Sequence, residues 1–135
     1  MAANREIEKL ERRWNENRQG TSFAPYAEAL RKVGELERAQ EVLKQGLANH
    51  PDHIPGNIVL GRCCLDMGAD GEAEAAFSRV LGLDAENVIA LKALADITER
   101  HGRFAETDQW LRQLISFDPS NDEAKEQMAR VEAAR

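Results

Sequence analysis

The chain has 135 residues, the size of one domain, and its 24 acidic and 18 basic residues give a net charge of −6. A negative net charge repels phosphate backbones, so we expect no nucleic-acid partner. No segment approaches the ~20 consecutive apolar residues of a membrane helix, and the sequence starts without an apolar leader, so we expect a cytoplasmic protein with no membrane partner.

Every element that we predict is a helix, because aromatic residues make up only 5% of the chain while Ala, Leu and Glu are abundant. The first helix is indicated by Ile7, Leu10 and Trp14, which form one apolar stripe at helical spacing. We expect this N-terminal helix to cover the element that follows it.

The central part of the sequence repeats with a period of about 34 residues, most clearly at Gly34, Gly68 and Gly102. A single glycine at this spacing is typical of a turn that ends one helix and starts the next. Pro51 and Pro119 end the second helix of their repeats, since proline lacks the backbone N–H and crowds the preceding turn. Apolar residues follow helical spacing in each half-repeat. The predicted spans are 21–33, 36–49, 54–67, 70–83, 88–101 and 104–117.

After the third repeat, Ser120 and Glu123 form an S-x-x-E pattern typical of a capping box at the start of a helix. Ala124, Met128 and Val131 then share one face, which predicts a helix that runs to the end of the sequence.

The period, the order of small and large residues and the closing prolines resemble the tetratricopeptide repeat family over roughly residues 20 to 119. The resemblance implies an all-α fold, a right-handed α-solenoid of antiparallel helix hairpins. The departures Asn57, Ala85 and Thr107 predict looser packing at those positions. We expect a single domain, 1–135, with these parts: an N-terminal capping helix 1–19, repeats 20–53, 54–87 and 88–121, and a C-terminal solvating helix 122–135.

Residues that could carry chemistry are few, so we predict no enzyme, no cofactor and no metal site. His50 and His53 flank a turn, but no further Cys or His lies nearby in sequence to complete a metal site. The adjacent Cys63 and Cys64 cannot close a loop as a disulfide, and we expect free, buried thiols in a reducing compartment.

The resemblance implies a groove lined by the first helix of each hairpin, where the family binds a peptide or a partner helix. We therefore expect a non-catalytic interaction module that scaffolds a larger assembly, with a protein or peptide as partner. The partner-binding residues carried over from the family are Ala24, Glu28, Arg31, Lys32, Ile58, Arg62, Leu65, Asp66, Ile89, Lys92, Asp96, Glu99 and Arg100. They combine an apolar track with charges of both signs, which fits a partner with apolar anchors and alternating charge.

Two alternatives stay open at this point: these residues simply face solvent, or the chain is a structural subunit that forms a homo-oligomer through a terminal cap or the groove. One subtype of the family is excluded, the repeats that clamp a C-terminal carboxylate with Lys, Asn and Arg side chains. The matching residues here are Ala24, Glu28, Val59, Ile89 and Ala93.

Overall fold

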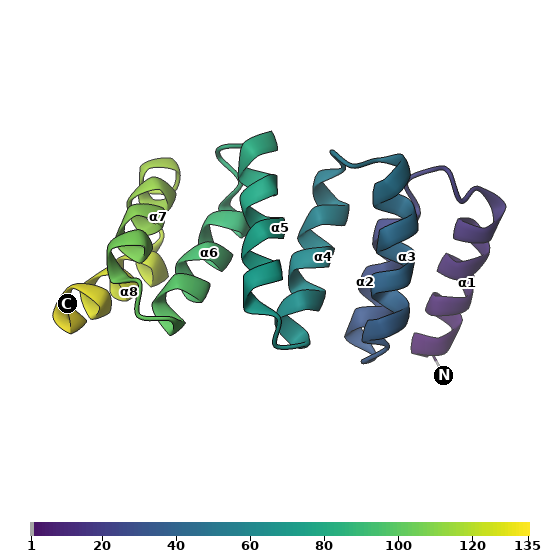
Figure 1. Cartoon of the computed structure of the whole chain (residues 1–135), viewed down its shortest axis with the longest axis horizontal. Helices are drawn as coiled ribbons and strands as arrows, with labels where there is room; N and C mark the ends of the chain where they lie inside the picture. The colour runs from purple at the N-terminus through teal and green to yellow at the C-terminus, as the bar shows by residue number, and fades with distance from the viewer. Residues whose placement is uncertain (1) are drawn as a thin grey trace. The chain divides into compact units, whose positions relative to one another are not determined.

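The computed structural model describes residues 2–135, so residue 1 of the predicted N-terminal segment lies outside the described range. All regular secondary structure in this range is helical, which confirms the predicted class (Figure 1). The helices are α1 (Ala2–Glu16), α2 (Phe23–Lys32), α3 (Leu36–Asn49), α4 (Ile54–Asp66), α5 (Asp70–Leu83), α6 (Val88–Arg100), α7 (Phe104–Phe117) and α8 (Asp122–Ala134).

The helix boundaries follow the period of the sequence. The second helices α3, α5 and α7 begin one full period apart, and so do α4, α6 and α8. Helix α8 therefore occupies the place of the first helix of a fourth repeat. Helix α2 is shorter than the other first helices and begins at Phe23, after a turn in which the Gly20 N–H donates to the Asn17 carbonyl.

Side-chain caps set the start of three first helices. His53, Asn87 and Asn121 each accept a hydrogen bond from the backbone N–H three residues later, at 3.0, 3.0 and 2.9 Å. The predicted capping box was wrong, because the cap of α8 is Asn121, whereas the Ser120 hydroxyl donates to Asp118. Asn121 lies one repeat after Asn87, so the repeat register identifies this cap better than the local S-x-x-E pattern.

The hairpin turns use glycine as predicted. Gly34, Gly68 and Gly102 have φ values of +84°, +74° and +72°, a left-handed conformation that other residues adopt only with strain. Each glycine ends a first helix, and two residues later a second helix begins.

The chain divides into two compact units, residues 1–76 and 77–135, which we describe separately and call unit 1 and unit 2. In unit 1, α1 packs on α2 of the first hairpin. Trp14 and Leu10 of α1 are buried with Tyr26 and Leu43, and the Trp14 and Tyr26 rings lie 5.5 Å apart.

Phe23 organises the rest of the unit 1 core. Its ring is fully buried against Gly46 and Gly56, where an added Cβ would lie 2.0 and 2.7 Å from the nearest ring atoms. The rings of His50 and His53 lie 6.3 and 5.0 Å from it. A large residue on α2 is therefore accommodated by glycine on α3 and at the start of α4.

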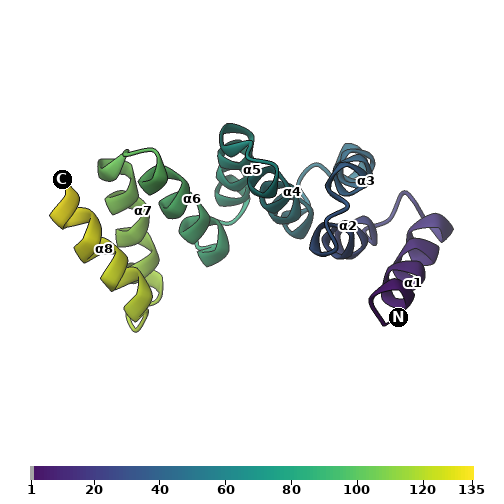
Figure 2. The same cartoon turned by 90° about the horizontal axis from the view of Figure 1, so that it is seen from below.

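In unit 2, α6 packs on α7 and α8 lies alongside α7 (Figure 2). Leu91, Leu111 and Leu114 are buried in the core that these helices share. Helix α8 contributes Ala124, with Met128 partly buried beside it.

The expected looser packing was wrong at two of the three departures. Thr107 is fully buried and forms a hydrogen bond of 2.8 Å with the buried Thr98 hydroxyl. Asn57 is only 3% exposed, and its amide donates to the carbonyls of Pro51 and His53. Ala85 lies exposed in a turn.

Candidate functional site

We call the exposed sides of the first helices, α2 and α4 in unit 1 and α6 and α8 in unit 2, the first-helix faces. In unit 1 four of the predicted residues form one ion-pair network. Glu28 of α2 pairs with Arg31 one turn later and with Arg62 of α4, at 2.9 Å for the latter, and Arg31 pairs with Asp66 at 2.9 Å. Glu28 and Arg62 occupy the same position in successive repeats, so this network links α2 to α4.

The hydrogen bonds of the network favour the charged form of its acidic side chain Glu28. Burial disfavours the charged form of Glu28, but hydrogen bonds from Arg31 and Arg62 outweigh it and lower the pKa of this carboxyl below its usual value. Two acids and two bases cancel, so the face carries no net charge from these residues. A charged partner would have to displace existing pairs.

The remaining predicted residues of unit 1 differ in accessibility. Ala24 and Ile58 are buried, at 3% and 8% exposure, so their surface is already covered by the packing of the unit. Leu65 is half-buried and Lys32 is exposed.

Unit 2 contains a second network, between α6 and α8. Gln127 is 2% exposed, and both polar atoms of its side-chain amide form hydrogen bonds. The amide oxygen accepts from Lys92 at 2.7 Å, and the amide nitrogen donates to Asp96 and Glu99 at 2.9 and 3.0 Å. Arg130 donates two hydrogen bonds to Glu99, and Lys92 pairs with Asp96. The hydrogen bonds from Arg130 lower the pKa of Glu99 below its usual value.

The sequence prediction omitted Gln127 and Arg130, because the last helix was interpreted only as a cap. The repeat period indicates both positions, since Arg130 lies one repeat after Asp96 and Gln127 lies one repeat after Ala93. Extending the repeat register into residues 122–135 would have placed both on the first-helix face.

The first two residues of α6 in unit 2 are exposed apolar side chains. Val88 and Ile89 are 45% and 43% exposed, and Arg100 at the other end of the helix is also exposed. Of the four predicted apolar residues, Ile89 is therefore the most accessible.

The other residues weighed for chemistry have structural roles. His50 contacts the Gln19 carbonyl at 2.6 Å, and the Nδ1 atom of His53 caps α4. Cys63 and Cys64 are buried free thiols, and burial raises the pKa of Cys63 to about 11, which disfavours the reactive thiolate. Among residues 2–135 no three His, Cys, Asp or Glu side chains converge on a point that could hold a metal ion.

No described helix is both long and apolar enough to cross a bilayer.

The chain is built of repeated helical hairpins, and polar networks join first helices within each unit. It is therefore a helical-repeat protein. The chain belongs to the tetratricopeptide repeat family, whose model matches residues 30–97. The predicted fold, an α-solenoid of antiparallel hairpins, is confirmed by solved structures of this family that cover nearly the whole chain.

One curated relative, cellulose synthase operon protein C of Xanthomonas axonopodis pv. citri, is 31% identical over 102 residues, which make up 73% of this chain. The matched region spans only 6% of that much longer protein.

Among solved structures, the Thermus thermophilus protein TTC0263 has a TM-score of 0.81 at 20% identity and covers 96% of this chain and 73% of its own. YrrB, described as a protein with an unusual peptide-binding site, has a TM-score of 0.83 at 19% identity, with 93% and 65% covered. The second repeat domain of human RPAP3, solved with an HSP70 peptide, has a TM-score of 0.75 at 20% identity, with 84% and 95% covered. TM-scores this high show a common fold, and at 19–20% identity the similarity shows the fold alone.

Proposed function

We propose that this chain is a non-catalytic protein-protein interaction module, which binds a peptide or a partner helix on its first-helix faces and scaffolds a larger assembly. The fold suggests interaction rather than catalysis, and two structural relatives are described as binding peptides. The observation that carries the proposal is the pair of networks, α2 with α4 and α6 with α8, which hold polar side chains in fixed positions.

A fixed face lowers the entropy lost on binding, because its side chains are already ordered before the partner arrives. Since the charges are paired within each unit, we expect the affinity to come mainly from apolar contact, with Ile89 as an anchor, and the networks to supply register and selectivity.

The polar outer side of α8 supports its role as a cap. Leu91 and Thr98 of α6 are buried, whereas the residues one repeat later, Lys125 and Glu132, are exposed. A polar surface at these positions favours contact with water over contact with a second copy. We therefore favour partner binding over self-association through this end.

The test uses a peptide selected from a displayed library on the whole chain, with its dissociation constant measured by fluorescence anisotropy. Ile89→Asp is expected to weaken binding at least tenfold, because it places a charge at an apolar anchor. Phe117→Asp is the matched control, since Phe117 is also 43% exposed but lies at the end of the second helix α7. Equal affinities for the two variants would refute binding on the α6 face. Ile58→Asp is unsuitable, because Ile58 is buried and its replacement would disturb folding.

A further inference from the structure

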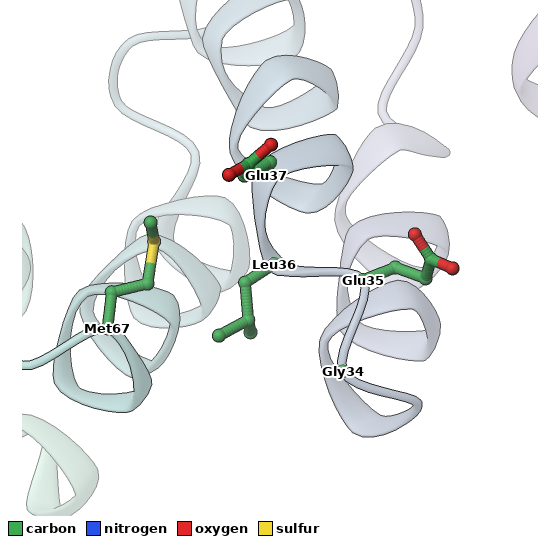
Figure 3. Close-up of a pocket in the computed structure, with 5 residues that line it drawn as sticks. All are labelled: Gly34, Glu35, Leu36, Glu37 and Met67. Carbon is green, nitrogen blue, oxygen red and sulfur yellow. The ribbon is translucent and has the colours of Figure 1, made fainter.

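Two small pockets adjoin the turn that joins α2 and α3 in unit 1. The larger has a volume of about 320 Å³ and is lined by Gly34, Glu35, Leu36, Glu37 and Met67 (Figure 3). The smaller, of about 160 Å³, is lined by Glu6, Ile7, Ala29, Lys32 and Val33. Val33 and Gly34 are consecutive residues, so both pockets adjoin the same turn. We call these ten residues together the turn surface.

The turn surface includes apolar side chains that are not buried in the core. Val33 is 48% exposed and Met67 is 43% exposed, values that are high for large apolar side chains. In Figure 3 the Leu36 side chain lies on the side of Met67, whereas Glu35 points away from both. Nothing lies within 4 Å of the position where Gly34 would carry a Cβ, so the surface is open above the turn.

Acidic residues line both pockets. Three of the lining residues, Glu6, Glu35 and Glu37, are exposed carboxylates, and Lys32 is the one basic residue among them. In the described part of the chain none of the three glutamates has an ion pair or a side-chain hydrogen bond. The first-helix faces differ, because there the acids are paired with arginine or lysine of the same unit.

We propose that the turn surface binds a second, basic type of segment: a linear peptide whose aliphatic side chains enter the two pockets and whose lysine or arginine side chains pair with Glu35 and Glu37. The larger pocket has a volume near the lower limit for small-molecule sites, so each pocket suits one side chain rather than a whole ligand. The unpaired carboxylates select for positive charge, since they attract cations without losing an existing partner. This surface shares Lys32 with the first-helix faces, but its other nine residues are not among the partner-binding residues predicted there, and its proposed role does not depend on the function of those faces.

The test is a titration of the isotope-labelled whole chain, followed by amide chemical shifts. The probe is a five-residue peptide in which two leucines alternate with three lysines. One control peptide has glutamate in place of lysine and the other has serine in place of leucine. We expect shifts at residues 33–37 and at Met67 with the probe alone. Equal shifts with either control peptide, or the absence of shifts at millimolar probe, would overturn the proposal.

Variants identify the source of the affinity. The double variant Glu35→Lys with Glu37→Lys and the single variant Met67→Glu are each expected to weaken the probe about tenfold or more. Glu41→Lys, a charge reversal at another exposed position of α3, is the matched control and is expected to leave affinity within about twofold. Shifts that centre on Arg62 and Lys92 would assign the probe to the first-helix faces and refute the turn surface as its site, without affecting the function proposed above.

Discussion

Replacing Gly46 with alanine is expected to destabilise unit 1, although glycine in a helix interior is usually the less stable choice. The alanine Cβ would lie 2.0 to 2.4 Å from three atoms of the Phe23 ring, far inside the 3.5 to 4.0 Å of a favourable carbon contact. The ring has no room to retreat, because Gly56 and the rings of His50 and His53 surround it.

The magnitude follows from two opposing terms. Alanine gains about 1 kcal/mol over glycine from helix propensity, and overpacking of a filled core costs about 1 to 3 kcal/mol, with the upper end appropriate for a contact this short. We therefore expect a net loss of about 2 kcal/mol in the free energy of unfolding, measured by urea denaturation. Adding Phe23→Leu should recover part of this loss, because repeat 3 has leucine at both equivalent positions, Leu91 and Leu114.

The matched control is Gly82→Ala in α5, where nothing lies within 4 Å of the added Cβ. This variant should be unchanged or more stable by up to about 1 kcal/mol. Gly46→Ala at or above the stability of the unmodified chain would refute the packing argument, as would a double variant with Phe23→Leu that is no more stable than Gly46→Ala alone.

Three further outcomes are expected. Burial and the neighbouring His50 lower the pKa of His53, so the folded state favours the neutral ring, and the free energy of unfolding should fall as pH drops from about 7.5 to 5. The variant His53→Asn, which introduces the residue type that caps α6 and α8, should remove part of this pH dependence. An unchanged pH dependence in the variant would exclude His53 as its source. Cys63 should react with a thiol reagent at pH 8 only at the rate of unfolding, because the pKa of this buried thiol is raised to about 11; fast labelling of the native chain would contradict this. Thr107→Val should cost about 1 kcal/mol, and Thr98→Val with Thr107→Val should cost less than the sum of the single variants; additive values in denaturation would show that the two hydroxyls are not coupled.

The constant repeat period made most of the fold predictable, because each glycine turn and each pair of helices recurs at a fixed distance in the sequence. The packing of Phe23 against Gly46 was not predictable in the same way. It depends on which side chains of two different helices meet, and the other repeats use different pairs at these positions. The same limit applies to Thr107, whose hydroxyl is hydrogen-bonded to Thr98 on the neighbouring helix.

The first-helix faces were predicted in part. Glu28 and Arg62 lie one repeat apart, so their proximity follows from the register. The burial of Ile58 does not, because it depends on how closely neighbouring helices approach. Gln127 was missed for a different reason: a buried amide has no distinctive local pattern, and only its place in the repeat identifies it.

The most direct test of the account is to map a library-selected peptide on the whole chain by intermolecular nuclear Overhauser effects. We predict contacts from the peptide to the first helices, with Ile89 of α6 among the contacting residues. Contacts confined to the second helices α3, α5 and α7 would contradict the account.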